Sequence, residues 1–266
     1  MEITIIISYY KALDNLKLVL KALNNQSSIG FEVIVSEDDH NGETISYLKK
    51  NKHLYRFPIV HLNQEEDVGF KKNIMLNRSI VESRADMLVF IDGDCIPHRH
   101  FVKEYTSNSG EGYFLAGRRC MLGEKTSAIM LKDESLEKLN FLSLLFSDTT
   151  VVKESIYSPY FHLSTKTRGL LGCNWGILKQ HLLDVNGFDE DYIKPGVGED
   201  NDIEWRLEAN GLKKKSIKNK AITYHIYHPR TYSEEGVYEN FQMFYKKQEA
   251  GHIKCLNGIE KIGGKK

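Results

Sequence analysis

Two carboxylates at the end of a buried strand are the first residues whose types and spacing predict chemistry. The apolar run 87–91 (MLVFI) is followed by Asp92, Gly93 and Asp94. Two carboxylates one residue apart in such a place are costly unless a cation lies between or beside them. The structural alternative is an Asp-Gly turn, which commonly ends a strand. Oxygen ligands of this kind suit Mg²⁺ or Mn²⁺, which usually share their coordination shell with phosphates, so we expect a diphosphate ligand.

A histidine-rich segment at 223–228 (TYHIYH) offers nitrogen ligands. A single histidine on a strand is more often a core or surface residue than a metal ligand. Beside the acidic pair, one of His225 and His228 becomes a candidate third ligand, because imidazole suits Mn²⁺ better than Mg²⁺. Residues three apart on a strand point to opposite faces, so we expect only one of the two to serve.

A second acidic cluster, Glu199 and Asp200, comes just before a helix predicted over 202–210. Capping that helix is the structural interpretation, because carboxylates there accept orphan amide hydrogen bonds and match the helix dipole. An ionised carboxylate in a cleft can also take a proton from an attacking hydroxyl. The two roles are compatible.

The elements that position these residues alternate between strand and helix. Strands are predicted over 3–7, 31–35, 57–62 and 87–91, and helices over 13–23, 43–51 and 70–82. Such alternation requires crossovers and builds a parallel sheet, at whose carboxyl edge ligands gather. Three polar segments fall at that edge: 8–11, 37–40 and 92–94.

The second half is less regular. Residues 113–118 predict a further strand, and 124–165 are mostly helical and loop-like, with an aromatic cluster at 157–162. Val237, Phe241 and Phe244 predict a C-terminal amphipathic helix. Packing against the domain is the preferred interpretation of this helix, and peripheral contact with a membrane surface is the minority one.

Composition narrows the class of protein. The 266 residues include 36 basic and 36 acidic side chains, so net charge attracts neither nucleic acid nor anionic lipid, and no nucleic-acid partner is expected. The four cysteines have no metal-like spacing and indicate free thiols in a reducing compartment. The chain starts directly in a strand and contains no apolar stretch of spanning length, which predicts a soluble, cytoplasmic protein without a signal peptide.

Several segments together resemble GT-A-fold glycosyltransferases of family 2. The first strand (IIISYYK), the second (VIVSEDD), the segment VGFKKN and the Asp-x-Asp motif in FIDGDCIP follow in that family's order. Further on, GLLGCNWGILKQHLLDVNGFDEDY and VGEDNDIEWRL resemble the motif shared by β-1,4-galactosyltransferases and chondroitin-polymerase-type enzymes. The Asp-x-Asp motif alone is weakly specific, whereas the ordered set is strong.

The resemblance implies an α/β fold of the GT-A (Rossmann-like) type, with a mostly parallel central sheet flanked by helices, a helical insertion and a C-terminal helix. We expect a GT-A domain over 1–230, with a nucleotide-binding half at 1–118 and an acceptor or catalytic half at 119–230. A helical extension and tail follow over 231–266.

The resemblance also implies roles at the donor. Asp38, with Glu37, is expected to contact the nucleoside, although Glu37 departs from the usual Asp. Lys72 stands where the family tends to have Arg, which turns a forked contact into a point-charge contact. Tyr10 and Trp175 are further residues expected to contact the nucleotide sugar.

The remaining implied roles concern the metal and the reaction. Asp92 is expected to hold ribose or metal, with Gly93 beside it, and Asp94 to coordinate a Mn²⁺ or Mg²⁺ ion that bridges both phosphates. His225 fits the family's late metal-binding histidine, and His228 is the fallback. Asp200 matches the family's catalytic base, and Glu199 is expected to position the sugar or acceptor.

The implied reaction is an inverting, metal-dependent transfer from a nucleotide-diphosphate sugar, most simply a uridine one, to a hydroxyl of a glycan or glycolipid, as in polysaccharide biosynthesis. Acceptor recognition is expected in 140–165 and around Trp175 and Trp205, since aromatic faces suit sugar rings.

Two other classes of protein remain open. A sugar-phosphate nucleotidyltransferase often carries a glycine-rich loop after its first strand, which residues 8–11 are not. A non-catalytic carbohydrate-binding protein has no need of Asp92, Asp94, Asp200 and His225 together.

Overall fold

The first part of the chain alternates strands and helices as predicted. The computed structural model describes residues 1–161, 168–196, 198–230 and 232–261. The first elements are β1 (Ile3–Tyr9), α1 (Leu13–Asn24), β2 (Phe31–Glu37), α2 (Gly42–Asn51), the 3-10 turn Lys52–Leu54, β3 (Ile59–Asn63), α3 (Lys72–Glu82) and β4 (Met87–Asp92). All four predicted strands and three predicted helices are confirmed, with small shifts at their ends.

The second part mixes short strands with helices. Its elements are β5 (Cys95–Pro97), α4 (Phe101–Asn108), β6 (Tyr113–Ala116), β7 (Arg118–Met121), α5 (Glu124–Asp133), α6 (Phe141–Leu145), the 3-10 turn Val152–Ser155, β8 (Asn174–Leu178), α7 (Lys179–Asp184), α8 (Glu199–Ala209), β9 (Lys213–Ser216), β10 (Ile222–His225) and α9 (Glu234–Glu249). The predicted helical insertion corresponds to α5 and α6, and the predicted C-terminal helix to α9.

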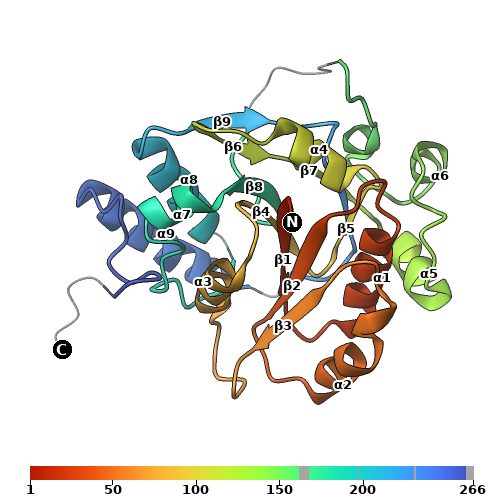
Figure 1. Cartoon of the computed structure of the whole chain (residues 1–266), viewed down its shortest axis with the longest axis horizontal. Coiled ribbons are helices and arrows are strands. Elements are labelled where there is room, and N and C mark those ends of the chain that lie inside the picture. Colours follow the sequence, from red (N-terminus) through yellow and green to blue (C-terminus); the bar gives the residue numbers. More distant parts are fainter. Residues whose placement is uncertain (162–167, 197, 231, 262–266) are drawn as a thin grey trace.

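These strands form two sheets (Figure 1). The large sheet has the order β3-β2-β1-β4-β8-β6-β9, and the small one the order β5-β10-β7. Strands β3, β2, β1 and β4 are parallel, so their carboxyl ends meet at one edge. Strand β8 runs antiparallel to both of its neighbours. The mostly parallel α/β sheet that the sequence predicted is confirmed.

Helices cover both faces of the large sheet, which explains why its central strands are apolar throughout. On one face, alternate residues of β1 such as Ile5 and Ile7 pack with Leu16 and Leu20 of α1. On the other face, residues of opposite parity, such as Ile6 of β1, pack in a second cluster that includes α3, α7 and α8. The sheet is therefore rigid beneath its carboxyl edge.

The strand predicted over 113–118 is wrong in one respect, because Gly117 divides it into β6 and β7. The Gly117 amide donates to the main-chain oxygen of Asn174 at 3.0 Å. A Cβ on Gly117 would lie 2.4 Å from the Asn174 side chain, so only glycine fits where the chain passes from one sheet to the other. The buried Asn174 amide donates to the main-chain oxygens of Arg118 and Ala221, which joins the two sheets.

The C-terminal helix packs on the domain, as the preferred interpretation predicted. Phe244 of α9 is 8% exposed, and its ring meets Trp205 of α8 edge-on with centroids 6.3 Å apart. Lys247 of α9 also contacts Asp189 and Asp191 at 2.5 Å. Across the described ranges, no helix combines the length and the apolar character needed to cross a bilayer.

Candidate active site

A tight turn at the end of β4 holds the two predicted aspartates. Gly93 donates its amide to the main-chain oxygen of Ser8 at 2.7 Å, which ties the turn to the end of β1. A Cβ on Gly93 would lie 2.9 Å from the Tyr9 ring and 3.4 Å from that oxygen. The glycine therefore allows the turn to approach β1 closely, and the side chains of Asp92 and Asp94 diverge from it.

Asp94 faces two histidines. Its Oδ2 lies 3.2 Å from His228 Nε2 and 3.7 Å from His225 Nε2, and the two imidazole rings are 5.0 Å apart. The strand alternation from which we expected only one histidine to serve does not extend to His228, because β10 ends at His225. Both histidines therefore remain candidate ligands.

The charges around Asp94 move the pKa values in a consistent way. Burial alone would raise the pKa of Asp94, but the hydrogen bond to His228 and the nearby His225 outweigh it and hold the pKa below its usual value. The hydrogen bond to Asp94 raises the pKa of His228 to about 9. Burial lowers the pKa of His225. Asp94 is therefore kept ionised.

These three residues fit a divalent cation. They combine one carboxylate with two imidazoles, a donor set that suits Mn²⁺ and other transition ions. The Nδ1 atom of His225 is buried and has no hydrogen-bond partner among the described residues. Such an orphaned polar atom indicates that the ring is available to a ligand.

Asp92 lies on the other side of the turn, against a half-buried lysine. Lys72 Nζ is 3.7 Å from Asp92 Oδ1 and 3.7 Å from Glu199 Oε1. Burial works to lower the pKa of Lys72, but Asp92, Glu199 and Asp200 together raise it above its usual value. Burial raises the pKa of Asp92 despite Lys72, and Asp94 and Asp200 add to the effect. Burial likewise raises the pKa of Glu199 to about 7.

Asp200 joins this lysine-centred group from the first turn of α8. The predicted capping role is wrong: the N-cap is Gly198, and Glu199 and Asp200 are the first two helical residues. Asp200 Oδ2 accepts the Gly172 amide at 2.8 Å. A Cβ on Gly172 would lie 2.3 Å from Asp200 Oδ1, so the glycine makes room for the carboxylate.

A cavity of about 730 Å³ opens along this edge of the sheet. Its lining includes the predicted residues Tyr10, Asp38, Lys72, Asp92, Gly93, Asp94, Glu199 and His228. Asp200 does not line it but borders a small void that shares Ser8, Lys72 and Glu199 with it. Sequence reasoning missed the lining residues Asp67, Phe70, Pro195, Gly196 and Tyr232. Only Phe70 lies in a motif, VGFKKN, that could have indicated it.

The two acids after β2 have different surroundings. Asp38 lines the cavity and accepts the Lys71 amide at 2.9 Å and the Gln64 side chain at 2.5 Å. Burial raises the pKa of Asp38 to about 6. Glu37 is 0% exposed and pairs with His61 of β3 at 2.6 Å. The expectation that Glu37 contacts the nucleoside is therefore wrong, because its side chain points into the fold.

Both tryptophans belong to the packing. Trp175 is 1% exposed and stacks on Phe90 at a centroid distance of 4.7 Å, so its expected contact with a sugar is wrong. Trp205 lies against α9, which corrects its expected role toward the acceptor. Part of the predicted acceptor segment, residues 162–167, lies outside the described residues.

The sheet order, with its antiparallel β8 and an acidic turn at the carboxyl edge, defines a GT-A fold, and comparison with known proteins agrees. Residues 4–128 match Glycosyl transferase family 2, and residues 153–229 match the N-terminal domain of galactosyltransferase. The chain thus contains a domain of the glycosyltransferase family 2 type, followed by a region similar to the N-terminal domain of galactosyltransferase. A search of curated proteins gave no significant match.

Solved structures share the fold at low sequence identity. TarS of S. aureus aligns over 93% of this chain with a TM-score of 0.62 and 16% identity, and the match covers 39% of TarS. The mannosyltransferase PcManGT of Pyrobaculum calidifontis, in complex with GDP-Man and Mn²⁺, aligns over 94% with a TM-score of 0.63 and 14% identity, covering 64% of that chain. TarS 1-349 in complex with UDP-GlcNAc aligns over 96%, with a TM-score of 0.58, 14% identity and 70% of that chain covered. This chain therefore spans only part of each of these proteins.

Proposed function

We propose that this glycosyltransferase moves a sugar from a nucleotide-diphosphate sugar, most simply a uridine one, to a hydroxyl of a glycan or glycolipid, with inversion at the anomeric carbon. The observation that carries the proposal is that the two aspartates of one turn have different neighbours. Asp94 lies beside two imidazoles. Asp92 lies beside Lys72, near Glu199 and Asp200. A cavity of about 730 Å³ runs past both and suits a ligand of this size.

In the proposed reaction Asp200 acts as the general base. Its Oδ2 accepts a hydrogen bond from the Gly172 amide at 2.8 Å, which fixes the carboxylate. Asp200 takes the proton of the acceptor hydroxyl as that oxygen bonds to the anomeric carbon and the bond to the diphosphate breaks. Glu199 and Lys72 position the sugar beside it.

Asp94, His225 and His228 would hold a divalent cation, which when bound would neutralise charge on the leaving diphosphate as a Lewis acid. Asp38, at the carboxyl end of β2, is proposed to bind the nucleoside, and Tyr10, 53% exposed on the cavity wall, to contact the donor. The described complexes of similar folds, one with GDP-Man and Mn²⁺ and one with UDP-GlcNAc, support a donor of this class.

A donor screen tests the proposal. The purified protein is incubated with a panel of uridine- and guanosine-diphosphate sugars and Mn²⁺, and nucleoside diphosphate release is measured with and without candidate glycan acceptors. We expect diphosphate release with one donor, and a product of inverted anomeric configuration by NMR. Pyrophosphate release would instead identify a nucleotidyltransferase. No turnover with any donor, together with binding of glycan alone, would identify a carbohydrate-binding protein.

We also propose that the domain divides at residue 118 into a nucleotide-binding half and an acceptor half, and that a C-terminal extension begins at residue 231. A peripheral membrane contact through the C-terminal segment is likewise only proposed, and flotation of the protein with anionic vesicles tests it.

A further inference from the structure

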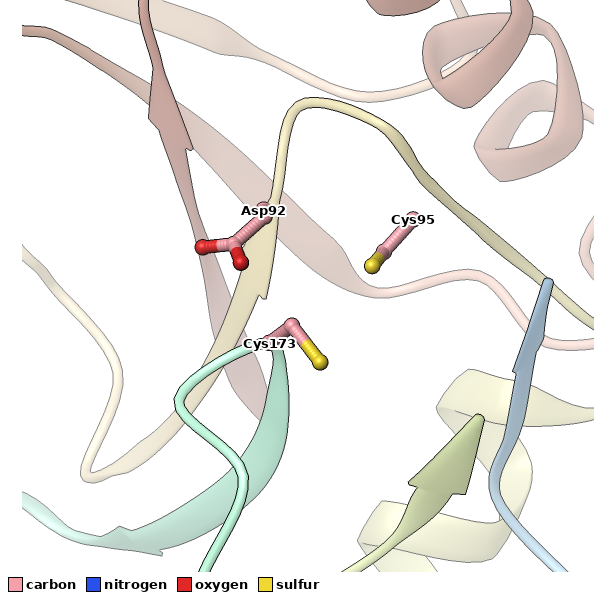
Figure 2. Close-up of side chains that lie close together, drawn as sticks. All are labelled: Asp92, Cys95 and Cys173. Carbon is pink, nitrogen blue, oxygen red and sulfur yellow. The ribbon is translucent and has the colours of Figure 1, made fainter. Parts of the chain in front are cut away.

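The turn that joins β4 to β5 carries a buried thiol that the proposed reaction does not use. Cys95 follows Asp94 directly and is 0% exposed, and Cys173, from a distant part of the chain, is 2% exposed. Figure 2 shows both cysteines with Asp92 around the β4–β5 turn. One carboxylate oxygen of Asp92 and the two sulfur atoms lie within 4.8 Å of one another.

Strand register fixes this grouping. Strand β8 pairs antiparallel with β4, with Asn174 opposite Ile91, so the next position along each strand sets Cys173 beside Asp92. Cross-strand neighbours of this kind have their Cβ atoms about 4.5–5.5 Å apart. Cys95 is held in turn by its pairing with His225 of β10. Backbone hydrogen bonds therefore bring the thiols to the carboxylate.

A positive charge lies against one of the thiols. Arg119 of β7 donates from Nη1 to Cys173 Sγ at 3.2 Å. This contact places a hydrogen-bond donor against the sulfur and orients the Cys173 side chain within the group. The other two free cysteines of the chain, Cys120 and Cys255, are buried elsewhere and take no part in the group.

We propose that Asp92, Cys95 and Cys173 form a second metal site, specific for a thiophilic divalent cation of the Zn²⁺ class. It adjoins the site at Asp94, whose Oδ1 accepts a hydrogen bond from Cys95 Sγ at 3.4 Å. Thiolates select Zn²⁺ over Mg²⁺ and Mn²⁺, and Zn²⁺ binds cysteine and aspartate in a four-coordinate shell. Both thiols release their protons to solvent on binding. Of the three residues, Asp92 lines the cavity, and its side chain is 29% exposed.

Occupancy of this site has a consequence for the enzyme. A Zn²⁺ ion there engages the Asp92 carboxylate that now faces Lys72 at 3.7 Å. The charge balance of the lysine-centred group then changes, and we expect Zn²⁺ to inhibit sugar transfer. Binding itself is measured without the transfer reaction, so failure of this inference leaves the proposed function intact.

Zinc absorption spectroscopy on the unmodified protein is the decisive experiment. The full chain, kept in a phosphine reductant, is loaded with one equivalent of Zn²⁺, and its coordination shell is measured by extended X-ray absorption fine structure. We expect two sulfur scatterers at about 2.3 Å. The alternative group of Asp94, Cys95 and His225, also within 4.8 Å of one another, would give one sulfur and an imidazole. That result, or a shell without sulfur, would overturn the proposal.

Variants assign the ligands. Titration with Cd²⁺ is followed by its thiolate charge-transfer band in wild type, Cys95→Ser, Cys173→Ser and the control Cys255→Ser, a buried thiol far from the turn. We expect each site variant to bind Cd²⁺ at least about tenfold more weakly, and the control to match wild type. Circular dichroism checks that each variant is folded. An unchanged band in folded Cys173→Ser would contradict the assignment.

Discussion

Asp92 and Asp94 are two residues apart in one turn, yet their surroundings act on them in opposite directions. Burial raises the pKa of Asp92, and the nearby carboxylates of Asp94 and Asp200 add to this rise. By contrast, His228 and His225 hold the pKa of Asp94 below its usual value. Asp94 is partnered by groups that can themselves bind a metal. Asp92 forms its ion pair with Lys72, a cation that cannot bind a metal, and has Cys95 and Cys173 as further neighbours.

The two aspartates of this motif can take part in different chemistry because different parts of the chain supply the neighbours of each one. Strand β10 and the residues after it supply the histidines, while α3 supplies Lys72 and the first turn of α8 supplies Glu199 and Asp200. We therefore expect variants on the two sides to fail differently: the Asp94 side in metal and donor binding, and the Asp200 side in turnover.

The largest effect is expected for Asp94→Ala. Removing this carboxylate leaves only the imidazoles to hold the metal, so Mn²⁺-dependent affinity for uridine diphosphate should fall to background. Isothermal titration calorimetry measures this affinity, with Asp86→Ala, an exposed acid just before β4, as control. Unchanged affinity in the Asp94 variant would break the comparison.

Asp200→Asn tests the opposite side. The amide retains the size of the carboxylate but cannot accept a proton, so kcat should fall at least about a hundredfold while donor affinity stays near wild type. Steady-state kinetics and calorimetry measure the two quantities separately, with the exposed Asp133→Asn as control. Near-normal transfer by the purified variant would remove Asp200 as the base.

Gly172→Ala tests whether the position of the Asp200 carboxylate matters, because it displaces this side chain without changing its chemical group. The added Cβ would lie 2.3 Å from Asp200 Oδ1, whereas the matched Gly169→Ala places its Cβ 3.5 Å from Glu204. We expect kcat of Gly172→Ala to fall by about ten- to a hundredfold, since small misplacements of a catalytic group have effects of this size. Equal rates in the two alanine variants would show that the position of Asp200 does not matter.

The two histidines can be ranked by Mn²⁺ titration of His225→Ala and His228→Ala. His225 is 7% exposed and solvent cannot readily replace its ring, so its loss should weaken Mn²⁺ binding by at least about tenfold. His228 lies at the exposed mouth of the cavity, and its loss should have a smaller effect. The reverse order would make His228 the principal ligand.

The smallest effect is a stability change at Asp38. Burial raises its pKa from 3.8 to about 6, so the folded state binds this proton more tightly than the unfolded state. Between those values the free energy of unfolding therefore decreases as pH rises, and the loss is complete above about 6. Asp38→Asn should raise Tm at neutral pH by roughly 2–4 °C, with the gain shrinking toward about pH 4. Differential scanning calorimetry at several pH values measures it; a pH-independent gain would contradict the burial argument.

Much of the fold could be predicted because its signals are local. The β-branched runs of β1, β2 and β4 and the leucine spacing of α1 each indicate their own structure. The strand ends then place residues 8–11, 37–40 and 92–94 at one edge. Three of the failures have a common cause, since each depended on a distant partner. Glu37 turns toward His61, Trp175 packs on Phe90, and Gly117 divides a strand because Asn174 lies beside it.

The order of residues by itself determined which chemical groups were present and that parallel strands would collect some of them at one edge, because side-chain type and periodicity are properties of short segments. Tertiary structure alone decided which groups meet. Strand register and helix placement bring Lys72 close to both Asp92 and Glu199. They also place Asp200 against the Gly172 amide, and Cys95 near Cys173. Those contacts join segments far apart along the chain, and no local pattern encodes them.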